Sequence, residues 1–530
     1  MRKKIKIILL AFMLLFLLAA VIFIFSTDIN LMIKKEFNES FLEKKQLSTL
    51  SADKMEKEYD HFVDILSTSC PEVINGNDLT GINFNDKNEL YRSRIKQASS
   101  NMEYFYVLKA ITSDIKSCHT DILYSDIMQY SSNINGYASS VNSAVYQYSD
   151  YWKEELFNCV NDYTGETIGF AYCNGKYISC NIEGGNIYYL KEVSGVPVDT
   201  YVKDTISLWK INYDFKFQKA FRNSIVFDKE EGQQQVQLTL EDELGQKSEQ
   251  TAFINWKSEI YTGYSFLLNT NSSNEPYDAD FYYDTERSVC FIRLNSMSGD
   301  TDKFSADIEK IPNDIENIVL DLRGNSGGYP MFAKENVYSK LFSKSAYIET
   351  QSTVFKSKYN NFFDKKFDEL NSDVLSVISD SDDKKIYSIT DNYIGNSSNS
   401  RNVYILTSHN TASAADELTA AAKSCGTAVV IGENTGGEGI GLNSSVIIPL
   451  KTSGLCLRYN SAESKNPDGS INSIYGTSPD YYSTLTENNY MLWQKIENSE
   501  KDPSEYENRL KWDNVLTETL ELIKEKGNAE

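Results

Sequence analysis

The chain has 530 residues, of which 41% are hydrophobic and 24% are charged. It is long enough for several hydrophobic cores, and this composition is not that of a disordered protein. Its 52 Lys and Arg residues are outnumbered by 75 Asp and Glu residues, so the formal net charge is −23. Such a charge repels phosphate backbones and anionic lipid headgroups, which argues against nucleic acid as a partner.

The amino terminus combines basic charge with a long apolar run. The sequence opens with RKKIK at positions 2–6, and residues 7–25 are uncharged and apolar. As a helix this run would span roughly 28 Å, close to the thickness of a bilayer core. Because basic residues precede it and acids such as Asp28 follow it, the amino terminus is expected in the cytoplasm and the rest outside.

The sequence therefore predicts a single-pass membrane anchor over residues 1–28, with the rest of the chain extracytoplasmic at the cell membrane. The alternative is secretion after cleavage of a signal peptide. Secretory apolar regions are usually about 7–15 residues long, and no clear A-x-A cleavage site follows this run.

Eight cysteines are spread along the chain without the spacing of a zinc site, and no metal or cofactor is expected. In an exported chain cysteines can pair. Cys173 and Cys180 flank a turn-like Asn174-Gly175 pair and are candidates for a disulfide across a hairpin. Small buried thiols are the alternative.

The expected elements change character along the first half of the chain. Residues 29–150 are polar with apolar residues at helical spacing, as in HFVDIL (61–66), which predicts a helical domain. Residues 151–268 contain β-prone runs between turn residues, such as GFAY (169–172) and QVQLTL (235–240). These runs predict a small β-rich domain.

Strands and helices alternate over residues 280–525. Three buried runs predict strands: CFIRL (290–294), NIVLDL (317–322) and VYILT (403–407). A helical pattern over residues 302–311 lies between the first two, and this order predicts an α/β domain with parallel strand pairs. The Ser-, Asp- and Asn-rich stretch 358–401 looks like an insertion or lid, and the alternative is simply solvated loop and helix.

Three segments that follow predicted strands carry the candidate chemistry. TASAADE (411–417) opens a helix, where backbone N–H groups and the helix dipole can stabilise a developing oxyanion next to Ser413. A serine at a helix start is also a common N-cap, which is the structural alternative. DLRGNSGG (321–328) and GENTGGEG (432–439) are glycine-rich turns, whose exposed amides can bind an anion.

In this order, and with PDG (467–469) and GTSPD (476–480) after them, these segments resemble the S41 serine peptidases. That family contains the C-terminal processing (tail-specific) proteases and the tricorn core protease. The resemblance covers about residues 288–482. It implies a ClpP/crotonase-like α/β core, with Ser413 as the nucleophile and the amides of Ala414 and Gly327 as the oxyanion hole.

The resemblance also implies peptide or protein substrates. The β-rich domain occupies the slot that holds a PDZ module in the processing proteases, but it lacks a clear Gly-Leu-Gly-Phe loop. A degenerate PDZ-like domain that captures substrate C-termini is therefore an analogy only.

One departure from the family pattern decides the expected mechanism. The processing proteases carry a catalytic lysine in the third segment, where this chain has Glu438. A serine–lysine pair is therefore not expected, and the chain is closer to the tricorn-like branch, which uses histidine.

His119 is the expected general base. It lies in SCHTD (117–121), where the tricorn-like branch places its histidine, and an imidazole can accept the serine proton at neutral pH. A histidine that caps a helix C-terminus is the alternative. Of the two other histidines, His409 is expected to face away from the nucleophile and His61 to lie on the surface.

The group that would orient His119 is left open by the sequence. Family members often carry a glutamate shortly before the Gly-x-x-Pro-Asp segment, where this chain has a serine. The candidates for an orienting or supporting role are Cys118, Glu438, Glu463, Asp468 and Ser473.

The leading interpretation is an extracytoplasmic, membrane-anchored serine endopeptidase that acts on peptides or proteins without a metal or cofactor. A catalytically inactive binding protein on the same fold is the alternative, favoured by the missing lysine and the unassigned orienting group. A scaffold or adhesion protein would leave the three glycine- and serine-rich segments unexplained.

Overall fold

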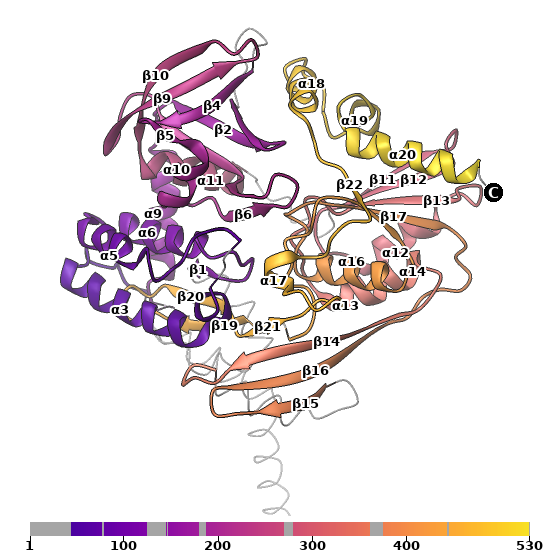
Figure 1. The fold of residues 1–530 in the computed structure, drawn as a ribbon, viewed down its shortest axis with the longest axis horizontal. Coiled ribbons are helices and arrows are strands. Elements are labelled where there is room, and N and C mark those ends of the chain that lie inside the picture. The colour runs from indigo at the N-terminus through magenta and orange to yellow at the C-terminus, as the bar shows by residue number, and fades with distance from the viewer. Residues whose placement is uncertain are drawn as a thin grey trace, which may run out of the picture.

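The computed structural model describes residues 44–76, 79–124, 145, 147–179, 187–269, 279–360, 375–442 and 445–528 (Figure 1). The expected anchor and Cys180 lie outside these residues, so the anchor and the hairpin disulfide stay predictions. Within the described part of the chain, no helix is both long and apolar enough to cross a bilayer.

The N-terminal part of the described chain is helical, as expected. Its helices are α3 (Ala52–Ser69), α4 (Pro71–Ile74), α5 (Asn88–Gln97), α6 (Asn101–Ser113) and α9 (Ser149–Asn161). Helix α6 is almost wholly buried, and the Ser100 side chain caps its first turn by accepting the Glu103 N–H. Phe62 of α3 and Leu108 of α6 share one hydrophobic core.

The next part is an antiparallel β-domain with a core of its own. Its seven-stranded sheet has the order β3-β2-β8-β10-β9-β4-β5. The strands are β2 (Thr167–Cys173), β3 (Lys176–Ser179), β4 (Tyr188–Val193), β5 (Val196–Pro197), β8 (Ser224–Asp228), β9 (Gln234–Asp242) and β10 (Lys247–Ile254). A β6–β7 hairpin (Ile211–Asp214, Lys219–Arg222) and helices α10 (Val198–Asp204) and α11 (Trp256–Asn269) accompany it. A PDZ-like identity for this domain stays a prediction.

The α/β core is built on a six-stranded sheet of order β11-β12-β13-β17-β18-β22. Its strands are β11 (Ala279–Asp284), β12 (Val289–Leu294), β13 (Asn317–Asp321), β17 (Asn402–Thr407), β18 (Val429–Gly432) and β22 (Tyr481–Tyr482). All neighbouring pairs from β12 to β22 are parallel, which confirms the expected parallel α/β arrangement. A ClpP/crotonase-like topology stays a prediction.

Helices cover both faces of this sheet, and each face has its own hydrophobic cluster (Figure 1). One face holds α12 (Thr301–Glu309), α13 (Pro330–Phe332), the π-helix η3 (Ala333–Tyr338), α14 (Ser339–Leu341) and α16 (Ala414–Ser424). The C-terminal helices are α18 (Glu487–Glu497), α19 (Tyr506–Trp512) and α20 (Asn514–Gly527), of which α19 and α20 pack on the other face.

Two smaller antiparallel sheets lie outside the six-stranded sheet. One has the order β15-β16-β14-β21, from β14 (Ala346–Phe355), β15 (Leu375–Asp380), β16 (Lys384–Tyr393) and β21 (Ala462–Ser464). The other has the order β1-β20-β19, from β1 (Asp121–Leu123), β19 (Ser445–Pro449) and β20 (Cys456–Asn460). Leu457 of β20 joins the core of the N-terminal helices, so that core contains residues that are far apart in the sequence.

The alternative of solvated loop and helix over residues 358–401 is wrong for most of its described part. Residues 375–380 and 384–393 are the strands β15 and β16. The inward residues Tyr387 and Ile389 are buried, but polar neighbours at many positions hide the alternation in the sequence.

Candidate active site

Ser413 lies at a sharp turn between β17 and α16. Its backbone adopts φ 53° and ψ −129°, a left-handed region that residues other than glycine rarely occupy. The Ser413 side chain makes no capping hydrogen bond to the helix that it precedes. The N-cap alternative is therefore wrong, and the strained backbone, which costs about 1–3 kcal/mol, is typical of functional sites.

The imidazole of His119 faces the Ser413 hydroxyl. The distance from His119 Nε2 to Ser413 Oγ is 3.2 Å, although 294 positions separate the two residues. Antiparallel pairing of β1 with β20 brings the histidine there, with Asp121 opposite Arg458. The Arg458 guanidinium donates to the backbone carbonyl oxygens of His119 (3.0 Å) and Cys118 (3.3 Å). These bonds hold the backbone of the histidine segment.

Glu438 lies beside His119 on the side away from Ser413. Its Oε2 accepts the backbone N–H of His119 (2.8 Å) and the thiol of Cys118 (2.7 Å). The same oxygen is 3.4 Å from His119 Nδ1. A positive φ of 58° at Glu438 sets the direction of this side chain. Hydroxyl, imidazole and carboxylate thus follow one another in the order found in serine hydrolase triads.

Burial sets the charge state of the imidazole. It lowers the pKa of His119 more than the neighbouring Glu438 carboxylate raises it. The ring is therefore neutral at neutral pH, which is the form that accepts a proton. Burial alone would raise the pKa of Glu438, but His119 and the Cys118 thiol outweigh it, and the pKa lies below its ordinary value.

Two further buried ionisable groups lie close to this carboxylate. Burial, and then the charge of Glu438, raises the pKa of Glu72 well above its ordinary value. Burial lowers the pKa of Lys116, whose ammonium donates to the carbonyl oxygen of Ser473 (2.8 Å). The N-terminal helices thus contribute an acid and a base to the surroundings of the site.

The other candidates for orienting His119 lie elsewhere. Glu463 accepts a hydrogen bond from Asn75 (2.6 Å), and Asp468 is exposed and binds Ser470 within its own turn. In the described residues, neither they nor Ser473 form a hydrogen bond or ion pair with the His119 side chain. Only Cys118 and Glu438, of the five candidates, meet at the imidazole.

Gly327 of the DLRGNSGG turn lies against Ser413, and the next residue, Gly328, lies against Met297. A Cβ atom on Gly327, at φ 106°, would be 2.5 Å from Ser413 Cβ and 3.0 Å from the nitrogen of Ala414. The Gly327 N–H already donates to Asn325 Oδ1 (2.9 Å). The N–H groups of Ala414 and Gly328 have no hydrogen-bond acceptor among the described residues, and Gly328 is exposed.

Asp416 is an important buried residue that the sequence did not single out. Its Oδ1 accepts from the hydroxyls of Thr435 (2.5 Å) and Thr477 (2.6 Å). Its Oδ2 accepts from the Gly439 N–H (3.1 Å) and the Asn472 amide (2.9 Å). This carboxylate therefore ties the helix behind Ser413 to the loop that carries Glu438. The only sequence signal was an acid within a run of small residues.

The two remaining histidines take no part in this arrangement. His409 Nδ1 is 2.8 Å from Glu433 Oε2, so His409 faces away from Ser413 as expected. His61 is half-buried, and its Nδ1 lies 3.3 Å from the Tyr359 hydroxyl, so it is less exposed than expected.

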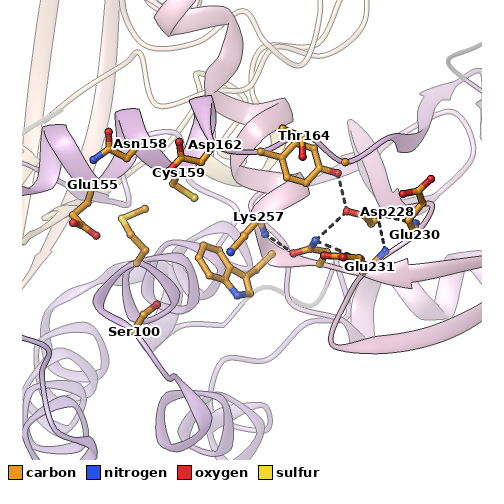
Figure 2. A pocket seen from close by; sticks show the side chains of 15 residues that line it. Ser100, Glu155, Asn158, Cys159, Asp162, Thr164, Asp228, Glu230, Glu231 and Lys257 are labelled. Atoms are coloured by element: carbon orange, nitrogen blue, oxygen red, sulfur yellow. Dashed lines mark hydrogen bonds between the residues drawn. The ribbon is translucent and has the colours of Figure 1, made fainter.

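Two hollows in the surface differ in their relation to the nucleophile. A pocket of about 420 Å³ opens between the β-domain and the core sheet, and Gly324, Ser408 and Asn410 of the turns around Ser413 line it. A larger pocket of about 550 Å³ lies between α9 and the β8 region, and none of the candidate site residues lines it (Figure 2). Its buried carboxylate, Asp228, is already bonded to Tyr163 and Asn255.

Residues 288–483, which include Ser413 and Glu438, match the family model of peptidase family S41. The chain shares this segment, less than half of its length, with the S41 peptidases. It is accordingly a serine peptidase, a hydrolase of peptide bonds. His119 lies outside the matched segment.

Solved structures resemble the chain at low identity. Mature CPAF complexed with lactacystin is 11% identical over 85% of this chain and 98% of its own, with a TM-score of 0.48. The photosystem II D1 C-terminal processing protease is 14% identical over 81% and 93%, with a TM-score of 0.34. The tricorn protease is 12% identical over 89% of this chain and 37% of its own, with a TM-score of 0.32. No curated protein matches the sequence.

Proposed function

We propose that the chain is an extracytoplasmic, membrane-anchored serine endopeptidase with Ser413 as nucleophile, His119 as general base and Glu438 as the carboxylate that orients the imidazole. The observation that carries the proposal is the 3.2 Å approach of His119 Nε2 to Ser413 Oγ, at a strained serine that caps no helix. The membrane location rests on residues 1–28 of the sequence alone.

The path of the proton follows from the neighbours of the two imidazole nitrogens. With the proton on Nδ1, directed at Glu438 Oε2, the lone pair on Nε2 accepts the hydroxyl proton as Ser413 Oγ attacks the substrate carbonyl carbon. The imidazolium then gives this proton to the leaving amine, and water repeats the sequence on the acyl-enzyme. The 3.4 Å gap to Glu438 is long for a hydrogen bond and is expected to tighten when substrate is bound.

The oxyanion of each tetrahedral intermediate is assigned to the N–H groups of Ala414 and Gly328. Ala414 is the first residue of α16, where the helix dipole adds positive potential. Gly328 replaces Gly327 in this role because the Gly327 amide is bonded to Asn325.

The chain is assigned to the tricorn-like, histidine-dependent kind of S41 peptidase. The position of the catalytic lysine is taken by Glu438, and the nearby Lys116 is bonded to the carbonyl oxygen of Ser473. The pocket of about 420 Å³ beside Ser408 and Asn410 is the proposed binding cleft for an unstructured peptide segment.

Active-site labelling of the full-length, detergent-solubilised protein tests the proposal. A fluorophosphonate should label the parent at Ser413, and the parent should cleave an unstructured peptide. Ser413→Ala should do neither while its melting temperature stays within a few degrees. An intact parent that shows neither labelling nor cleavage across about pH 6–9 would leave the inactive binding protein as the better description.

A further inference from the structure

Three side chains beside the nucleophile form a cluster that the peptidase chemistry does not fully use. The sulfur of Cys118, a ring nitrogen of His119 and a carboxylate oxygen of Glu438 all lie within 4.8 Å of one another. Thiolate, imidazole and carboxylate are the three ligand types that bind zinc in proteins.

The cluster also contains buried polar atoms that lack partners. In the described part of the chain, His119 Nδ1 and Glu438 Oε1 have no hydrogen-bond partner. The side chain of Glu438 is fully buried and that of His119 is 15% exposed. Buried polar atoms without a partner cost free energy unless an ion, a proton or water satisfies them.

The distances are close to those of a tetrahedral zinc site. With Zn–N and Zn–O bonds near 2.0–2.1 Å, the two ligand atoms lie about 3.3 Å apart. His119 Nδ1 and Glu438 Oε2 are 3.4 Å apart. The thiol sulfur is 2.7 Å from the same oxygen, so it must retreat by about 0.8 Å, or the unpartnered Oε1 must bind instead.

We propose that a zinc-class divalent cation binds Cys118 Sγ, His119 Nδ1 and Glu438 and reversibly switches the peptidase off. On binding, the thiol releases its proton to solvent, and water fills the fourth position. Hard cations such as Ca²⁺ and Mg²⁺ prefer oxygen ligands and do not fit this donor set.

Inhibition is expected because the metal and Ser413 contact the two nitrogens of the same imidazole. This expectation rests on the proposed function. A metal on Nδ1 of a neutral imidazole leaves the proton on Nε2. Nε2 then donates to Ser413 Oγ and has no lone pair for the hydroxyl proton. The metal also occupies the carboxylate that orients the ring. Ser413 therefore loses its base without being touched.

Cobalt substitution tests the binding site independently of catalysis. Full-length Ser413→Ala keeps all three ligands, and Co²⁺ should give it one thiolate-to-cobalt charge-transfer band per chain, which Zn²⁺ abolishes by competition. Adding Cys118→Ser should remove the band and weaken zinc binding by at least about tenfold. Cys425→Ser, which changes another partly buried free thiol, should leave both unchanged. A missing band, or a band that survives Cys118→Ser, overturns the proposal.

Labelling tests the inhibitory effect. Zn²⁺ should slow fluorophosphonate labelling of the parent, and EDTA should restore it. The Cys118→Ser variant should be labelled at the same rate with and without this Zn²⁺ concentration. Binding without slower labelling, or equal inhibition of Cys118→Ser, overturns the switch. If the parent is never labelled, the proposed function fails, and the cobalt spectra still decide the metal site.

Discussion

At the scale of single residues, the orientation of His119 depends on Glu438, a residue in a left-handed backbone conformation. Its carboxylate accepts the backbone N–H of His119 and lies 3.4 Å from Nδ1 of the ring. A neutral amide at this position cannot stabilise the imidazolium that forms in the transition state.

We expect Glu438→Gln to lower kcat by about 10²–10⁴-fold with little change in KM, as His119→Ala should. Because the two residues act as one unit, the double variant should be no slower than His119→Ala alone. Glu463→Gln is the matched control, since Glu463 binds Asn75 and not the histidine. Steady-state kinetics decide the assignment, which fails if Glu463→Gln costs as much as Glu438→Gln.

Gly327 is needed because no side chain fits between its turn and the nucleophile. A Cβ there would lie 2.5 Å from Ser413 Cβ, and the φ of 106° is unfavourable for other residues. Gly327→Ala should therefore displace Ser413 and lower kcat at least about 100-fold.

Gly426→Ala is a control that distinguishes the two effects expected at Gly327, the steric clash of a new Cβ and the strain of a positive φ. Gly426 has a positive φ of 60°, but nothing lies within 4 Å of a Cβ built on it. It should lose about 1 kcal/mol of unfolding free energy and keep its kcat. Denaturant unfolding and kinetics on both variants test this, and a Gly327→Ala enzyme of parental kcat would rule out the close packing.

At the scale of elements, the pairing of β1 with β20 places His119, the proposed base, beside Ser413. The three-residue strand β1 is too short to hold its own position, and Arg458 of the partner strand binds the carbonyl oxygens of His119 and Cys118. Lys210 binds the next carbonyl, that of Thr120 (2.8 Å).

Arg458→Ala should let this segment drift and lower kcat by about 10–100-fold, because a small displacement of a catalytic group is enough for such a loss. KM should change little, and Arg458→Lys should recover part of the rate by restoring one donor. Arg287→Ala, which removes an ion pair with Asp284 at the end of β11, is the control. An unchanged kcat in Arg458→Ala would show that β1 is held by other contacts.

The sequence allowed strands of the core to be predicted where apolar runs were continuous, as in β13 and β17. It led to Ser413 and His119 through local motifs, and the structure brings their side chains together. It could not select Glu438 from five candidates, because that choice depends on how the His119 segment and the Glu438 loop meet in the fold. It also missed β15 and β16, whose polar residues hide the alternation.

At the scale of the whole molecule, the site is assembled from segments that are far apart in the sequence. Ser413 and Glu438 lie in the segment that matches the family, and His119 comes from the end of the helical region. The core that Phe62 and Leu457 share holds these parts in contact. If His119 is the base, as proposed, activity requires the helical region as well as the matched segment.

The C-terminal helices are fastened to the core sheet by a buried cluster of charges. Arg323 donates to Asp321 at the end of β13 (2.8 Å) and to Asp513 at the start of α20 (2.5 Å). Arg509 of α19 lies 3.2 Å from Asp321. Burial alone would raise the pKa of Asp321, but Arg323 and then Arg509 outweigh it and lower the pKa to about 2.

This lowered pKa makes the fold sensitive to acid in a defined range. A carboxylate whose pKa falls from its usual value near 3.9 to about 2 on folding adds about 2 kcal/mol of stability above pH 5. The unfolded state binds the proton first, so this stability is lost as the pH falls from about 4 through 2, and roughly half is gone at pH 3.

Asp321→Asn should therefore be less stable than the parent by about 2 kcal/mol or more at pH 7, because it also leaves Arg323 and Arg509 with one anion fewer. The difference should shrink by about 1 kcal/mol at pH 3. Urea unfolding of both proteins at pH 7, 5 and 3 measures this, and the difference should be the same at pH 7 and 5. If the difference in unfolding free energy between the two proteins is as large at pH 3 as at pH 7, Asp321 is not the group whose protonation loosens α19 and α20 from the sheet.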